Sequence, residues 1–155
     1  MSSSPYIIRR PHKSDKDQWQ PLLLAYVEFY ESELENDVIT LLWQRINDCQ
    51  HPINCFIAED SATGKLIGFV HYIPHPSTWN EKLYCYLEDL FVSPSLRGVG
   101  VGAALIKAVN DEAKKQNCSD VYWHTQENNS RARGLYDKIT GGTDGFICYR
   151  IEPSD

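Results

Sequence analysis

Residues 84–102 read Tyr-Cys-Tyr-Leu-Glu-Asp-Leu-Phe-Val-Ser-Pro-Ser-Leu-Arg-Gly-Val-Gly-Val-Gly, and this stretch decides the fold. Its first half, Tyr84–Val92, is rich in aromatic and other β-favouring residues, and Ser93-Pro94 ends it because proline cannot donate to a strand ladder. Apolar residues at helical spacing follow from Val101 to Ala113. The stretch therefore predicts a well-bounded central strand, a turn, a glycine-rich loop and a helix.

Three glycines at alternate positions, Gly98, Gly100 and Gly102, are expected on the first turn of that helix. The first N–H groups of a helix lack internal partners, and the helix dipole is positive at that end. Glycine lets a diphosphate come close to the backbone, while Arg97 adds a positive charge. The loop favours a diphosphate-bearing cofactor, although its spacing matches neither a P-loop nor the dinucleotide fingerprint, and alone it is a weak indicator.

A second cluster follows the strand-like residues 121–125 and contains Asn129-x-x-Ala132-x-x-x-Tyr136. Together with Arg97-x-x-Gly100-x-Gly102 behind a Leu-Glu-Asp-Leu-Phe-Val strand, this cluster resembles the GCN5-related N-acetyltransferase (GNAT) superfamily. Within it, the chain looks most like the small fungal histone and D-amino-acid acetyltransferases and the diamine acetyltransferases. The pair of motifs in this order is far more specific than either motif alone.

The resemblance implies one N-acetyltransferase domain over residues 1–155, with an α/β (α+β) fold whose mixed, mostly antiparallel sheet is flanked by helices. It implies acetyl-CoA as cosubstrate, no metal, and direct transfer of the acetyl group to a primary amine of a small molecule, amino acid or basic peptide such as a histone tail. The residues that it assigns to cofactor binding are Leu90, Phe91, Val92, Arg97, Gly98, Val99, Gly100, Val101, Gly102, Asn129, Arg131 and Tyr136. The backbone of the first three would pair with pantetheine as an added strand does.

Acetyl transfer to an amine needs a base for the amine and a proton for the leaving thiolate. Glu88 and Asp89 are the candidate bases, and because side chains alternate along a strand we expect only one to face the acceptor. Resemblance to the diamine acetyltransferases favours Glu88, acting through water, whereas resemblance to the fungal histone-type enzymes keeps Asp89 open. The alternative for both is a structural carboxylate.

Tyr136 is the candidate acid that protonates the coenzyme A sulfur, with a half-buried helix tyrosine as the alternative. Asn129 is placed to cap the helix that carries Tyr136 and, by resemblance, to hydrogen-bond the pantetheine arm. Two other classes of function stay open. One is a module that senses acyl-CoA without turnover, which the presence of both carboxylates and Tyr136 disfavours; the other is a different nucleotide-phosphate-binding protein.

Composition narrows the partners and the compartment. A net charge of −6 and a pI near 5.3 argue against a general nucleic-acid binder and lean toward cationic partners. Five cysteines without a disulfide-type spacing predict reduced thiols in the cytoplasm or nucleus. No apolar run reaches membrane-spanning length, and the first residues lack the hydrophobic stretch of a signal peptide.

The remaining elements follow from periodicity and turn residues. We expect a kink or restart at Pro21, an acidic aromatic connection over 29–36 that borders the acceptor site, and a loop over 74–80 where the acceptor enters. His71 and His75 are not expected to bind zinc, because no further ligand completes a set.

The terminal strand needs cover at its edge, which makes a homodimer plausible. The expected elements are strands at 6–9, 54–59, 66–73 and 146–151, and helices from Asp15 and over 38–48.

Overall fold

The structure is a computed structural model that describes residues 4–97 and 99–154. The chain forms two compact units, Met1–His124 and Thr125–Asp155. In chain order the elements are β1 (Tyr6–Arg9), the 3₁₀ turn η1 (Lys13–Asp15), α1 (Lys16–Phe29), α2 (Asn36–Ile46), β2 (Asn54–Asp60), β3 (Leu66–Pro76), β4 (Leu83–Val92), the 3₁₀ turn η2 (Pro94–Leu96), α3 (Val101–Lys115), β5 (Cys118–Tyr122) and α4 (Ser130–Thr140).

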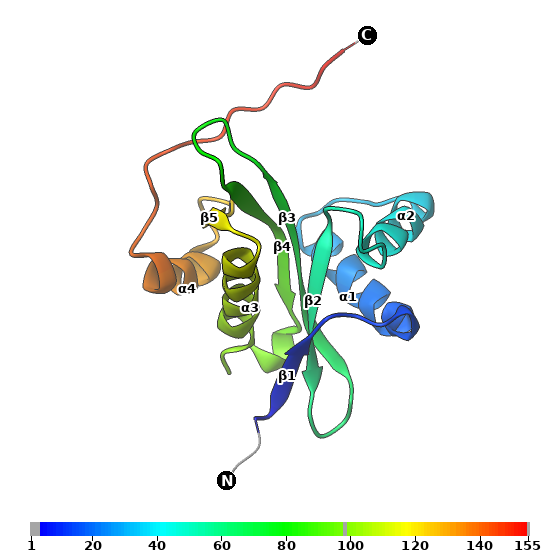
Figure 1. Ribbon diagram of the computed structural model, residues 1–155. Helices are drawn as coiled ribbons and strands as arrows, with labels where there is room; N and C mark the ends of the chain where they lie inside the picture. The colour runs from blue at the N-terminus through cyan, green and yellow to red at the C-terminus, as the bar shows by residue number, and fades with distance from the viewer. Residues whose placement is uncertain (1–3, 98, 155) are drawn as a thin grey trace. The chain divides into compact units, whose positions relative to one another are not determined.

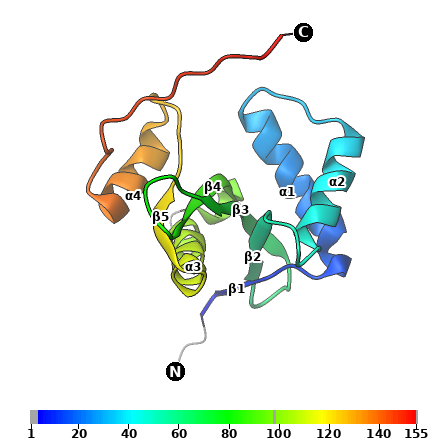
Figure 2. The ribbon, with the colours of Figure 1, turned by 45° about the horizontal axis from the view of Figure 1, so that its top comes forward.

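The first unit is built on a five-stranded sheet in the order β1-β2-β3-β4-β5. The pairs from β1 to β4 are antiparallel, and β4 and β5 are parallel. Figures 1 and 2 show α1 and α2 on one face of this sheet and α3 on the other. The predicted mixed, mostly antiparallel sheet flanked by helices is therefore confirmed.

The core between the sheet and α1 and α2 is dominated by aromatic rings. Trp19 of α1 is fully buried and packs on Trp43 of α2, with 4.7 Å between the ring centroids. Phe69 and Phe91 from β3 and β4 complete this layer from the sheet side. Burial of such rings, which contributes a few kcal/mol each, fixes both helices on the sheet.

On the opposite face, the buried side of α3 packs against the sheet through Leu105 and Val109. Gly68 of β3 permits this close packing, since a Cβ there would lie 2.8 Å from the Phe91 carbonyl oxygen and 3.4 Å from Leu105. The N-terminus of α3 is thereby held against β3 and β4. Across residues 4–97 and 99–154, none of the helices combines the length and apolar character of a membrane span.

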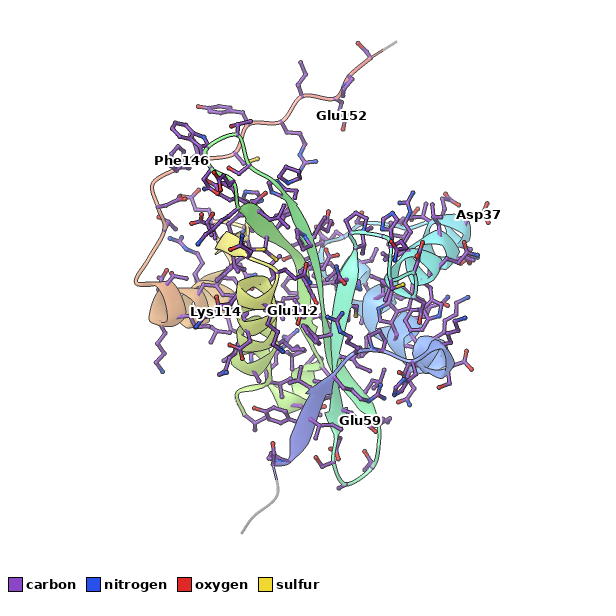
Figure 3. The ribbon with its side chains drawn as sticks, in the orientation of Figure 1. Asp37, Glu59, Glu112, Lys114, Phe146 and Glu152 are labelled. Atoms are coloured by element: carbon purple, nitrogen blue, oxygen red, sulfur yellow. The ribbon has the colours of Figure 1, made fainter. Side chains whose placement is uncertain are left out.

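Arg9 ties the edge of the sheet to the start of α1. Its guanidinium donates to Asp15 at 2.8 Å and 3.1 Å and to Glu59, labelled in Figure 3, at 2.7 Å. The hydrogen bonds from Arg9 lower the pKa of Asp15 below its usual value. This bidentate contact sets the direction in which the chain leaves β1 and enters α1.

Two helix predictions need correction. α1 runs without interruption from Lys16 to Phe29, so of the two predicted outcomes at Pro21, a kink or a restart, the restart is wrong. Packing of Trp19, Leu23 and Val27 on the sheet outweighs one missing hydrogen bond. The second helix begins and ends two residues earlier than predicted, at Asn36 and Ile46.

The predicted loop over 74–80 is also wrong in part, because β3 continues to Pro76. Pro74 and Pro76 lie opposite Cys85 and Leu83 of β4, whereas pairing with β2 ends at Tyr72. An edge position tolerates proline, because no second neighbour needs the missing N–H. The sheet therefore extends past β2 by these residues.

The last part of the chain departs most from prediction. The strand expected at 121–125 occupies Cys118–Tyr122, where it pairs with Leu83–Tyr86 of β4. No strand forms over 146–151, so that prediction is wrong for the single chain. A strand needs a hydrogen-bonding neighbour, and the described residues pair none with this segment.

Candidate active site

A β-bulge in β4 shapes the site. His71 lies opposite Asp89, but the next residue, Tyr72, lies opposite Leu87, so Glu88 is the extra residue. Directly opposed residues share a face of the sheet, so Leu87 and Asp89 face opposite sides although they are two apart. The bulge thus turns the Asp89 side chain toward α1. It leaves Glu88 without an opposite residue on β3.

The bulge opens onto a cleft of about 520 Å³ between β4 and the two N-terminal helices. Both Glu88 and Asp89 line this cleft, so the expectation that only one carboxylate can face it is wrong. The remaining lining residues are Leu23, Tyr26, Val27 and Tyr30 of α1, Ser32 and Leu34 of the connection, and Val38, Leu41, Leu42 and Arg45 of α2. The cleft is an apolar, aromatic channel with two carboxylates at the sheet and one guanidinium on α2.

The 29–36 connection borders this cleft as predicted, but its acidic residues are not the ones that line it. Tyr30, Ser32 and Leu34 line the cleft, whereas none of the three glutamates of the connection, Glu31, Glu33 and Glu35, does. Burial, together with the charge of Asp89, raises the pKa of the Tyr30 phenol. Tyr30 is therefore a neutral hydrogen-bonding group at the cleft.

The electrostatics distinguish the two carboxylates. Glu88 is exposed to solvent, but desolvation of its carboxyl group raises its pKa above the usual value, and the negative charge of Asp89 raises it further. Asp89 instead has a fixed partner: its Oδ2 lies 2.9 Å from Nδ1 of His71. A carboxyl group with a raised pKa beside an anchored neighbour is the usual arrangement of a general base.

β4 presents an open edge next to this site. β5 pairs with β4 only as far as Tyr86, so residues 87–92 have a strand neighbour only in β3 among the described residues. Ser93 N–H donates to the Ile67 carbonyl at 2.8 Å, which makes this a hydrogen-bonded pair of the ladder. Because the pattern alternates, the backbone groups of Leu90 and Val92 point away from β3. Phe91 is buried in the core, so only its backbone can contribute.

The glycine loop leads into α3 with a left-handed residue. Gly100 is the N-cap with φ 87°, a conformation that favours glycine. Gly100 precedes the helix and Gly102 lies in its first turn, while the predicted Gly98 lies outside the described residues. The prediction that the glycines lie on the first turn therefore holds for Gly102, whereas Gly100 precedes the helix as its N-cap.

Three further predicted binding residues border this loop. Val101 is buried, and Val99 is 56% exposed. Arg97 folds back on β4: its Nε donates to the Val92 carbonyl at 3.1 Å, and its guanidinium lies 5.8 Å from the Phe91 ring centroid.

The second unit carries the other predicted site residues on one helix. The Asn129 side chain caps α4 and accepts a hydrogen bond from the Ala132 N–H at 3.4 Å, which confirms the predicted cap. Arg131 is exposed on the first turn, and Tyr136 lies half-buried two turns from the cap.

His71 and His75 lie on β3 with separate partners. His75 Nε2 lies 2.7 Å from the Tyr122 hydroxyl, and His71 contacts Asp89 and Trp19. In the described part of the chain, no group of three or more potential ligands could hold a metal ion.

With this geometry in place, comparison with known proteins identifies the class and then the family. The profile of the acetyltransferase (GNAT) family matches residues 17–141. A D-amino-acid N-acetyltransferase of Saccharomyces cerevisiae is 31% identical over 150 residues, which cover 97% of this chain and 93% of the relative. A thialysine N-epsilon-acetyltransferase of Bos taurus is 36% identical over 110 residues, 64% of each chain.

The crystal structure of a ribosomal-protein-alanine N-acetyltransferase from Brucella melitensis has the same fold, with a TM-score of 0.79 at 22% identity over 95% of this chain and 99% of that one. The protein is thus an N-acetyltransferase. It belongs to the GNAT family, whose members generally use acetyl-CoA.

Sequence reasoning missed three residues of the cleft and its support: Trp19, Arg45 and His71. Trp19 was indistinguishable from an ordinary core residue, and Arg45 from a solvated helix residue. His71 was considered only as a metal ligand. The signal that could have found it was the hairpin register, which places it opposite Asp89.

Proposed function

We propose that this protein is an acetyl-CoA-dependent enzyme that transfers an acetyl group to a primary amine of a small molecule or amino acid by direct attack, with both compact units acting as one domain. The observation that carries the proposal is the bulge in β4, which sets Glu88 and Asp89 in the cleft beside an open strand edge. Acetyl-CoA supplies the activated thioester. Basic peptides stay within the acceptor class.

Each step needs a group from the chain. Glu88 takes the proton of the incoming ammonium, directly or through water. Its raised pKa makes the carboxylate a stronger base than an ordinary glutamate. The outward backbone groups of Leu90 and Val92 hold the pantetheine arm as an added strand. The loop from Arg97 to Gly102 and the N-terminus of α3 bind the diphosphate. From α4, Asn129 and Arg131 bind the cofactor, and Tyr136 protonates the leaving sulfur.

The direct test combines turnover with cofactor binding. Release of free thiol from acetyl-CoA is expected in the presence of an amine. Gly100→Asp is expected to weaken acetyl-CoA binding at least tenfold by calorimetry, because it adds a side chain and a negative charge at a left-handed position in the phosphate path. Gly64→Asp is the matched control, since Gly64 also has a positive φ, of 70°, but lies in the β2–β3 turn.

The same assay separates the alternatives. Binding of acetyl-CoA without thiol release for any amine would indicate a sensing module. Stabilisation by ATP or NAD but not by acetyl-CoA would indicate another nucleotide-phosphate-binding protein, because a ligand of the native state raises the melting temperature. Equal loss of binding in Gly100→Asp and Gly64→Asp would remove the glycine loop from the site.

Arg45 narrows the acceptor. Arg45 lines the same cleft as the two carboxylates and carries the opposite charge. Among the described residues, no ion pair to Arg45 is found. The cleft therefore suits an acceptor with three groups: an amine that contacts Glu88, an apolar side chain that packs along α1 and α2, and a carboxylate that binds the Arg45 guanidinium. We therefore favour an amino acid over a polyamine, in line with the activity for which the yeast relative is named.

Arg45→Gln is expected to raise KM for an apolar amino acid roughly tenfold, since one charge-assisted hydrogen bond at an exposed site is lost. The decarboxylated amine of the same side chain should be acetylated equally well by both forms, and Arg45→Lys should be intermediate. Steady-state kinetics with such a pair, phenylalanine and phenethylamine, measures the difference. An equal change for both acceptors would show that Arg45 does not bind the carboxylate.

We also propose a homodimer formed through the C-terminal segment 146–151. Phe146, Ile147, Tyr149 and Ile151 are 75–88% exposed in the single chain, and Figure 3 shows Phe146 on an extended stretch without secondary structure. Large exposed apolar side chains in a β-favouring sequence are suited to pairing with a second copy.

The double variant Ile147→Asp and Tyr149→Asp is expected to halve the mass measured by light scattering during gel filtration. The cause is the loss of apolar burial at the interface and the introduced charge. Ser154→Asp, which adds charge without removing an apolar side chain, should remain dimeric. A wild-type chain that is monomeric at tens of micromolar would contradict the proposal.

A reducing compartment, cytoplasmic or nuclear, fits the thiols. All five cysteines are free. Burial raises the pKa of Cys85 to about 12 and also raises the pKa of Cys118, which keeps both thiols protonated and unreactive.

A further inference from the structure

A buried chain of hydrogen bonds runs from the core to the cleft. Trp19 and His71 are 0% and 1% exposed. The indole N–H of Trp19 donates to Nε2 of His71 at 3.2 Å, and Nδ1 of His71 lies 2.9 Å from Oδ2 of Asp89. The chain thus links α1, β3 and β4 and ends on a carboxylate of the candidate active site.

The geometry decides the protonation of the imidazole. An indole nitrogen can only donate a hydrogen bond, so Nε2 of His71 must be the acceptor and carries no proton. The proton is therefore on Nδ1, which donates to Asp89. A second proton on Nε2 would face the indole N–H directly, so Trp19 blocks the position through which His71 would pass a proton onward.

We propose that His71 is a positioning residue: a neutral imidazole, locked by Trp19, that orients the Asp89 carboxylate as a fixed anion for the acceptor's ammonium group and leaves proton transfer to Glu88. This inference rests on the proposed acetyltransferase function. The bulge supplies the necessary geometry, because it turns Asp89 onto the face of His71 while Glu88 stays without a strand partner. The Oδ2 atom of Asp89 accepts from His71, and Asp89 lines the cleft.

Other groups around the imidazole cannot replace this contact. The ring of Phe69 lies beside it at a tilt of 31°, with 4.6 Å between the centroids, and the register places Cys55 of β2 opposite His71. Burial keeps the Cys55 thiol neutral by raising its pKa. The titratable or charged groups that line the cleft or lie opposite His71 are Cys55 on β2, Glu88 and Asp89 on β4, Tyr26 and Tyr30 on α1, and Arg45 on α2.

Two amide substitutions separate the two hydrogen bonds of His71. In His71→Asn the amide lies near the place of Nδ1 and can still donate to Asp89. In His71→Gln it reaches the place of Nε2 and can still accept from Trp19. If His71 positions Asp89, His71→Gln should lower kcat/KM for the amine roughly ten- to a hundred-fold, whereas His71→Asn should keep most of it. If His71 serves only the core, activity should follow the melting temperatures of the two variants instead.

The pH profile and NMR complete the test. The fall of kcat/KM at low pH should persist in His71→Asn, because Glu88 titrates there; its disappearance would make His71 the proton-transfer group and overturn the proposal. Nitrogen-15 NMR of the wild-type side chain should show the Nδ1–H form, and the Nε2–H or doubly protonated form at neutral pH would also overturn it. Absence of acetylation by the wild type would refute the proposed function. The NMR measurement needs no turnover, so it would still test the hydrogen bonds of His71 to Trp19 and Asp89.

Discussion

Glu88→Gln is expected to lower kcat for amine acetylation by roughly 10²- to 10⁴-fold while acetyl-CoA still binds, because a general base contributes about that much. Glutamine keeps the size of the side chain and cannot accept the proton. Stopped-flow or steady-state release of thiol gives kcat, and calorimetry gives the cofactor Kd. Asp89→Asn is the comparison variant: because Asp89 is proposed to hold the acceptor's ammonium, its loss should mainly raise KM for the amine, and a loss of kcat as large as that of Glu88→Gln would transfer the role of base to Asp89.

The pH dependence follows from the direction of the pKa shift. Glu88 must be ionised to act as a base, and desolvation and Asp89 raise its pKa. Activity should therefore be full above this raised pKa and fall as the pH drops through it, at a higher pH than for an ordinary glutamate. Asp89→Asn removes a charge that raises this pKa, so its acid limb should move to lower pH. A limb that moves to higher pH would contradict the electrostatic coupling.

Tyr136→Phe is expected to reduce kcat by roughly 10²- to 10⁴-fold and to change the acetyl-CoA Kd only a few-fold, since a single hydroxyl is removed. The prediction rests on the position of Tyr136 on α4, seven residues after the capping Asn129 and so about two turns along the helix. The loss should shrink with an acyl donor whose thiol is more acidic, because a better leaving group needs less protonation. Near-full turnover of the variant would mean that solvent or another residue protonates the thiolate.

Local sequence signals predicted the elements that depend on near neighbours. β1, the start of β2, the end of β4 and the capped start of α4 agree with the predictions to within a residue. These features depend on turn residues, alternation and capping within a few positions of the chain. The glycine loop before α3 is of the same kind, and together with the Asn129-x-x-Ala132-x-x-x-Tyr136 cluster it indicated the correct family.

Features that depend on pairing between distant residues were not predictable in this way. Nothing local in Leu87-Glu88-Asp89 marks a bulge, because its position is set by the register between β3 and β4. The same register extends β3 through two prolines. The C-terminal segment has the composition of a strand and yet forms none in the single chain, since strand formation requires a partner.

Local propensity and short motifs were enough to identify the family, the strand–loop–helix that presents the glycine loop, and the residue types available for chemistry. Only the tertiary structure decided that both carboxylates line one cleft, that Arg45 shares it, and that His71 is bound by Trp19 and Asp89. The physical reason is that a bulge shifts side-chain alternation by one position. Such a shift is fixed by long-range strand pairing and by the packing of α1 on the sheet.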